Sequence, residues 1–167
     1  MLPPVLNHQH ELLTLNMKEL PIYTDALPGV DVQPLFLDPH AGIWCLRVLF
    51  KPGVTLPTHY HTGTVHLWTL SGKWVYAEYP DQPQTAGCYL FEPGSSIHTF
   101  TTPADNTEIT DTIMIVSGSN VNFMPDGQFV GMLDANSIIM IVENLIKERG
   151  LEPARYIRAP SPDFTRK

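Results

Sequence analysis

The sequence predicts one all-β domain with a single C-terminal helix, and three observations support this. The chain has 167 residues, a length at which one domain around one core is the default. Its 16 Pro and 11 Gly divide it into short apolar runs, as expected for short strands joined by turns. Only 16% of its residues are charged, below the roughly one quarter of an average soluble domain. These features favour a compact β-barrel.

The strands are expected in residues 31–131, which we assign to the barrel. Residues 1–30 are interrupted by proline and weakly periodic, so we expect an N-terminal arm there. The strand-like runs that follow are apolar and bounded by turn residues: 32–37, 43–50, 55–61, 65–70, 73–79, 88–92, 97–102, 110–117 and 119–124. The run 65–70 is apolar on both faces, which is typical of a strand between the barrel interior and a second layer or a partner subunit.

Residues 132–167 are expected to form the helix and an extended tail. Pro125-Asp126-Gly127 predicts a turn before it. Asp134 or Asn136 can cap a helix that runs through Arg149 and stops at Gly150. Its apolar face is broad and comprises Ile138, Ile139, Ile141, Val142, Leu145 and Ile146.

The charge pattern restricts the classes of partner. The net charge is −7, from 10 basic and 17 acidic residues, and there is no basic cluster, so we expect neither nucleic acid nor membrane as a partner. No apolar run reaches the about 20 residues of a membrane span, and no leader pattern opens the chain, so we expect a cytoplasmic protein. The wide apolar faces of the helix and of run 65–70 predict a homodimer.

Three histidines are the main candidates for function. His59 and His61 lie two residues apart in a strand-like run, so their side chains point to the same face. A third imidazole from another strand, His98, would complete a three-ligand metal site with open positions for substrate. The His-x-His pair alone is weak evidence, because His8 and His10 form a second such pair without a strand around it.

The residues around these histidines strengthen the case. Gly53 stands with five residues between it and His59, and Gly72 closes the next strand. The second segment runs from Gly87 through Pro93 to His98. This frame resembles the two signature motifs of the cupin superfamily, G-x5-H-x-H-x3,4-E-x6-G and G-x5-P-x-G-x2-H, over about residues 53–98. The resemblance implies a double-stranded β-helix, or jelly-roll barrel, with a metal ion in its interior.

The frame departs from the motifs at two places. The position of the metal-ligand Glu in the first motif falls on Val65, and Ser95 replaces a Gly of the second. A site of three His without Glu resembles the iron-dependent cupin dioxygenases that cleave C–C bonds in acetylacetone and in 2,4'-dihydroxyacetophenone. Those enzymes carry a Glu six residues before the last His, as Glu92 stands before His98.

The resemblance implies an iron(II) dioxygenase acting on a small hydroxyketone or 1,3-diketone with O2. His59, His61 and His98 would be the ligands, and Glu92 would act from outside the first coordination shell. Several alternatives stay open at this point: zinc or nickel as the metal, His66 as a fourth ligand, a redox-neutral zinc enzyme, or a non-catalytic metal or small-molecule sensor. A purely structural interpretation also stays open, in which the three histidines are separate hydrogen-bonded core residues. His8, His10 and His40 lie in proline-rich or turn-like sequence and are expected to play no part.

Overall fold

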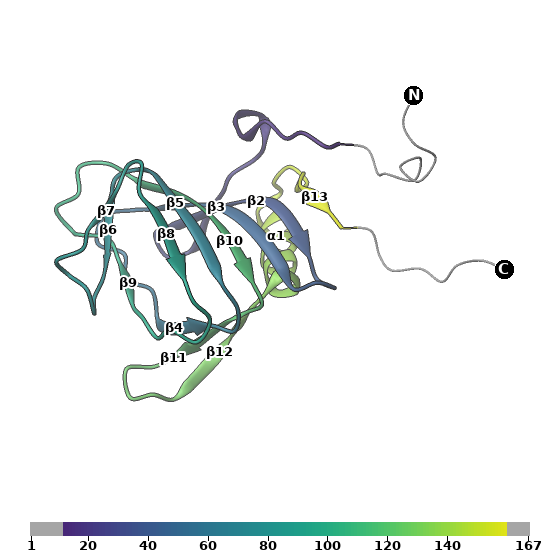
Figure 1. Ribbon diagram of the computed structural model, residues 1–167. Coiled ribbons are helices and arrows are strands. Elements are labelled where there is room, and N and C mark those ends of the chain that lie inside the picture. Colours follow the sequence, from purple (N-terminus) through teal and green to yellow (C-terminus); the bar gives the residue numbers. More distant parts are fainter. Residues whose placement is uncertain (1–11, 160–167) are drawn as a thin grey trace, which may run out of the picture.

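Two layers of β-strands face each other across a common core in the computed structural model, which describes residues 12–159 (Figure 1). The first layer is a seven-stranded sheet. Its strands, in spatial order, are β1 (Tyr23–Leu27), β2 (Val30–Asp38), β3 (Ile43–Phe50), β10 (Thr110–Ser117), β5 (Val65–Ser71) and β8 (Tyr89–Glu92), with β13 (Ile157–Arg158) parallel to β2. The single-domain barrel with a C-terminal helix that the sequence predicts is confirmed.

The second layer consists of two three-stranded sheets. One has the order β12 (Phe129–Leu133), β11 (Asn120–Phe123), β4 (Thr58–His61), and the other β7 (Gln84–Thr85), β6 (Lys73–Tyr76), β9 (Phe100–Thr101). Isolated antiparallel bridges join them, His59 with His98 and Thr55 with Thr101. A short 3-10 helix, η2 (Met17–Glu19), precedes the first strand.

The core lies between the layers because alternate side chains of each strand point inward. In β3 the burial alternates along the whole strand. Trp44, Phe50 and Trp74 are at most 1% exposed, and the ring of Phe100 stacks against Trp74 at a centroid distance of 4.7 Å. These aromatic residues belong to one hydrophobic core that extends to the buried face of the helix.

The helix α1 (Ala135–Arg149) begins and ends where the sequence predicts. Asp134 is its N-cap, and its carboxylate accepts hydrogen bonds from the Ser137 backbone N–H and hydroxyl, both at 2.8 Å. Gly150 ends it in the left-handed conformation, with φ of 62°. The helix packs against β1, β2 and β12, and none of the helices within residues 12–159 is long and apolar enough to cross a membrane.

Four strands differ from the expectation. β1 lies within the segment expected to be an arm, and β7, β12 and β13 fall where no strand was expected. The sequences of β1 and β12 show little alternation because most of their side chains are exposed or half-buried. β7 and β13 have only two residues each, which is too short for any periodic signal. These strands form through pairing with neighbours and not through their own pattern.

Candidate metal centre

The strand β4 presents two imidazoles to the barrel interior. Its burial alternates, with His59 and His61 both 4% exposed and the residues between and before them half-buried. The two rings lie 5.1 Å apart between centroids, edge to face. The i, i+2 spacing therefore does bring both side chains to one face, as the sequence predicts.

The backbone of His98 is paired directly with that of His59. The His59 N–H donates to the His98 carbonyl at 3.0 Å, and the His98 N–H donates to the His59 carbonyl at 2.9 Å. Residues that exchange both hydrogen bonds across an antiparallel pair have side chains on the same face. The His98 ring consequently lies 4.6 Å from the His59 ring and 5.5 Å from the His61 ring, between centroids.

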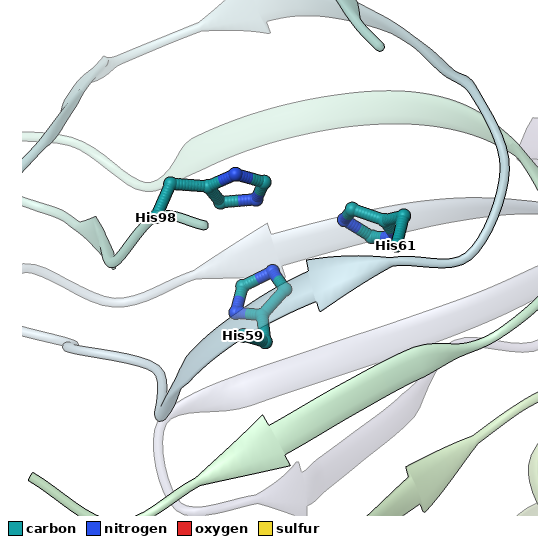
Figure 2. Close-up of side chains that lie close together, drawn as sticks. All are labelled: His59, His61 and His98. Atoms are coloured by element: carbon teal, nitrogen blue, oxygen red, sulfur yellow. The ribbon is translucent and has the colours of Figure 1, made fainter. Parts of the chain in front are cut away.

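The three imidazoles converge on one point (Figure 2). Each offers a nitrogen, and these atoms all lie within 4.8 Å of one another. Two buried ring nitrogens, His61 Nδ1 and His98 Nε2, have no hydrogen-bond partner among the described residues. Buried polar atoms are normally satisfied, so an unpartnered nitrogen on two of the three clustered rings fits a metal ion as the missing partner. Imidazole nitrogens suit iron, zinc, nickel and copper.

The protonation of His59 suits a ligand. Its Nδ1 lies 2.8 Å from the Pro57 carbonyl, so the proton is held on Nδ1 and the lone pair of Nε2 is left free. Burial lowers the pKa of His59 to about 4, and burial also lowers the pKa of His98. Both rings are therefore neutral at pH 7, the form that binds metals.

Glu92 places a carboxylate against this cluster. It is 5% exposed, and its Oε2 lies 3.1 Å from His61 Nε2 and 3.3 Å from His98 Nε2. The buried phenol of Tyr76 donates a hydrogen bond to its Oε1. Burial raises the pKa of Glu92, but the neighbouring imidazoles and the Tyr76 hydroxyl outweigh burial and bring the pKa below its usual value. The carboxylate is thus ionised at neutral pH.

The position of Glu92 accounts for the missing motif carboxylate. Val65 holds the place of the motif Glu, and in the β5–β8 pair its register partner is Glu92. A carboxylate from the adjacent strand therefore enters the region of the barrel that the motif Glu would reach. Glu92 is buried there and does not face solvent. The sequence does not indicate the hydrogen bond between Tyr76 and Glu92, because it depends on packing between the two layers.

The other histidines lie elsewhere. His66 is on the outer face of β5, where its Nδ1 makes a 2.8 Å hydrogen bond with the Tyr89 hydroxyl. Its neighbours Val65 and Leu67 take the interior face, so the structure does not bring His66 to the cluster as a fourth ligand. His40 is exposed in the turn between β2 and β3. His8 and His10 lie outside the described residues.

Two cavities border the cluster, and they share no lining residue. The first, of about 270 Å³, has His59 in its wall and is otherwise mostly apolar. The second, of about 250 Å³, is lined by Glu92, His98 and Tyr76 together with polar residues such as Gln82 and Gln84. His59 and His98 therefore border cavities of a size for small molecules, although both side chains are buried.

The comparisons with known proteins identify the family. Residues 10–119, about two thirds of the chain, match the family described as the ChrR cupin-like domain. The chain belongs to this cupin family. Among curated proteins, none matches this cupin.

Solved structures of other cupins share its fold. A protein of unknown function with a cupin-like fold from Ralstonia eutropha JMP134 is 49% identical, with a TM-score of 0.87, over 95% of this chain and 99% of that chain. An RmlC-like cupin from the same organism is 24% identical, with a TM-score of 0.77, over 87% of this chain and 93% of that chain. An acetylacetone dioxygenase from Acinetobacter johnsonii is 16% identical, with a TM-score of 0.65, over 80% of this chain and 91% of that chain. At such low identity the last two show the fold alone.

Proposed function

We propose that this cupin is a non-haem iron(II) dioxygenase that cleaves a C–C bond of a small hydroxyketone or 1,3-diketone. The observation that carries the proposal is the cluster of three buried imidazoles with one carboxylate, Glu92, against two of them. The fold shared with an acetylacetone dioxygenase is consistent with this chemistry. For a hydroxyketone R–CO–CH₂OH, the reaction adds both atoms of O₂, breaks the bond between the two oxygenated carbons and yields RCOOH and HCOOH.

The ligand set would select an anionic substrate. His59, His61 and His98 would hold the ion, and these neutral ligands would themselves offset none of its 2+ charge. A bound iron(II) would supply open coordination positions for the substrate oxygens and the redox chemistry that uses O₂. Such a centre would favour an anionic enolate over a neutral ketone.

Glu92 would accept the proton that the substrate loses. Its Oε2 faces the cluster, 3.1 Å from His61 Nε2 and 3.3 Å from His98 Nε2, and its Oε1 is held by Tyr76. A carboxylate held by one oxygen presents the other in a fixed direction, which is what a general base requires. Glu92 would also orient His61 and His98 by its negative charge.

The decisive experiment combines metal analysis with an oxygen-electrode screen. We expect protein purified without added metal to contain about one ion per chain, and iron-loaded protein to consume O₂ when 2,4'-dihydroxyacetophenone, 2-hydroxyacetophenone or acetylacetone is added. Metal binding without oxygen uptake on any hydroxyketone or diketone would contradict the dioxygenase. That outcome would favour the redox-neutral zinc enzyme or the metal sensor.

A further inference from the structure

Two asparagines face the same part of the barrel interior as the histidine cluster. Strand β11 lies beside β4, with Asn120 opposite His61 and Asn122 opposite His59. Directly paired residues in an antiparallel sheet have Cβ atoms about 5 Å apart on a common face. Both amides therefore lie next to the imidazoles, in the wall of the 270 Å³ cavity.

Of the two, Asn120 has an unused hydrogen-bonding atom. Its Oδ1 is buried and has no hydrogen-bond partner among the described residues. Asn122, by contrast, donates through Nδ2 to the Gly131 carbonyl at 3.4 Å, within the β11–β12 hairpin. An unpaired buried acceptor is costly, so the Asn120 oxygen is poised for a donor that arrives with a ligand.

The rest of the cavity wall is apolar. Beyond His59 and the two asparagines, every lining side chain is a hydrocarbon, proline, glycine or methionine. The wall is built from α1, β12 and the facing strands of the large sheet, with Leu46, Met132, Ile138 and Ile141 among its members. One polar end beside the cluster and one apolar end toward α1 is the typical layout of a site for a small, mainly apolar ligand.

We propose that this cavity binds the apolar body of the substrate and that Asn120 accepts a hydrogen bond from a hydroxyl group beside the substrate carbonyl. The assignment rests on the proposed function for the role of the ion. It also narrows the substrate class. An α-hydroxyketone bearing an aryl or alkyl group supplies the donor that Asn120 Oδ1 needs, whereas the enolate of a 1,3-diketone offers only acceptors there.

Ligand binding to full-length, zinc-loaded protein tests the proposal without requiring turnover. Zinc accepts the same imidazole ligands and has no redox chemistry. Calorimetric titration would compare 2-hydroxyacetophenone with 1-phenyl-1,3-butanedione, which has the same phenyl body. We expect Asn120→Leu to weaken the hydroxyketone by about three- to tenfold, as for loss of one hydrogen bond, and to leave the diketone within about twofold. Asn144→Leu, the same change at an exposed position of α1, should alter neither.

A second pair of variants tests the apolar end. Ile141→Trp places a larger side chain in the cavity, whereas Met140→Trp places it on the exposed side of α1, where Met140 is 63% exposed. We expect Ile141→Trp to weaken 2-hydroxyacetophenone by about tenfold, the effect of losing part of a buried phenyl contact, and to spare hydroxyacetone, which lacks the ring. Met140→Trp should leave both affinities unchanged.

The outcomes separate this proposal from the proposed function. Equal weakening of hydroxyketone and diketone by Asn120→Leu, or no weakening, would overturn the role of Asn120. The smaller Asn120→Ala provides the same comparison if the leucine variant does not fold. Equal effects of Ile141→Trp on both hydroxyketones would overturn the cavity assignment. Should the expected pattern hold while iron-loaded protein consumes no O₂, the binding site stands and the dioxygenase proposal fails.

Discussion

At the scale of single residues, the face of the strand decides which histidines can meet. His59 and His61 point inward on β4, whereas His66 on β5 points outward to the Tyr89 hydroxyl. Adjacent residues of a strand point to opposite faces. The motif allows its spacing to vary by one residue, so the motif alone does not fix which residue faces inward. The three clustered histidines could be named from their motif frame, but the orientation of His66 depended on the register of β5 against β8 and β10.

Metal content should separate the two kinds of histidine. We expect His59→Ala to lower bound metal to about a tenth of the parent or less, since even indirect contacts to a metal contribute 10- to 100-fold in affinity. His66→Ala removes only the contact with Tyr89 and should keep metal near the parent level. Elemental analysis of both proteins, purified side by side, measures this. Equal losses from the two variants would show that His66 also binds the ion.

A second prediction at this scale concerns Glu92. Glu92→Gln keeps the shape and the acceptor for the Tyr76 hydroxyl but removes the charge beside His61 and His98. We expect metal occupancy within about twofold of the parent and turnover lower by about 10- to 100-fold. Oxygen consumption per bound iron measures the effect, with the exposed Glu108→Gln as the control. Full activity in Glu92→Gln would exclude the proposed base.

At the scale of secondary-structure elements, the turns of the barrel depend on a few glycines. Gly72 joins β5 to β6 with φ of 74°, and a Cβ there would lie 2.6 Å from the Thr110 Cα. Gly127, in the hairpin between β11 and β12, has φ of 86° and no heavy atom within 4 Å of an added Cβ. Both glycines have a left-handed backbone conformation, but only Gly72 lacks room for a Cβ atom.

Alanine substitutions at these glycines should separate backbone strain from steric clash. Gly127→Ala should lower the free energy of unfolding by about 1–2 kcal/mol, the cost of a left-handed non-glycine residue. Gly72→Ala should cost a further 1–3 kcal/mol or so, because the added methyl group overlaps Thr110. Urea unfolding measures both losses, provided that the dependence of the unfolding free energy on urea concentration is the same in parent and variants. Similar losses in the two variants would mean that the chain around Thr110 relaxes freely.

The elements that the sequence predicts are those with their own signal. β3 and β10 match the expected runs residue for residue, and α1 ends at the glycine that the pattern indicates. The strands β1 and β12, which the sequence did not predict, lie at sheet edges. An edge strand has one neighbouring strand and partly exposed side chains, so its sequence shows no clear alternation of apolar and polar residues. The consequence for the site is direct, because β12 forms a wall of the apolar cavity that could not be assigned from sequence.

At the scale of the whole molecule, the exposed apolar surface bears on the expected homodimer. The apolar face of α1 is largely covered by its own chain, since Ile138, Val142 and Leu145 are buried. The outer face of β5 and β8 remains open, with Trp68 39% and Tyr89 and Phe91 each 51% exposed. Clustered exposed aromatic residues are typical of protein interfaces. We propose that a second copy of the chain packs on this face.

Light scattering at micromolar concentration tests this proposal. We expect the parent protein to have the mass of a dimer and Trp68→Glu that of a monomer, because a carboxylate would be buried without a partner in the interface. Met140→Glu changes an exposed apolar residue of α1 and should leave the mass unchanged. A parent protein that runs as a monomer would contradict the proposed assembly.

The two cavities border different histidines, His59 and His98, and this has a consequence for the order of events in the proposed reaction. An organic molecule held in the apolar cavity beside His59 leaves the more polar cavity beside Glu92 and His98 unobstructed. In the proposed reaction, water and protons would then exchange beside Glu92 and His98 while the larger reactant occupies the apolar cavity. The organic reactant would thus stay bound beside His59 through the steps in which smaller species bind and leave beside His98.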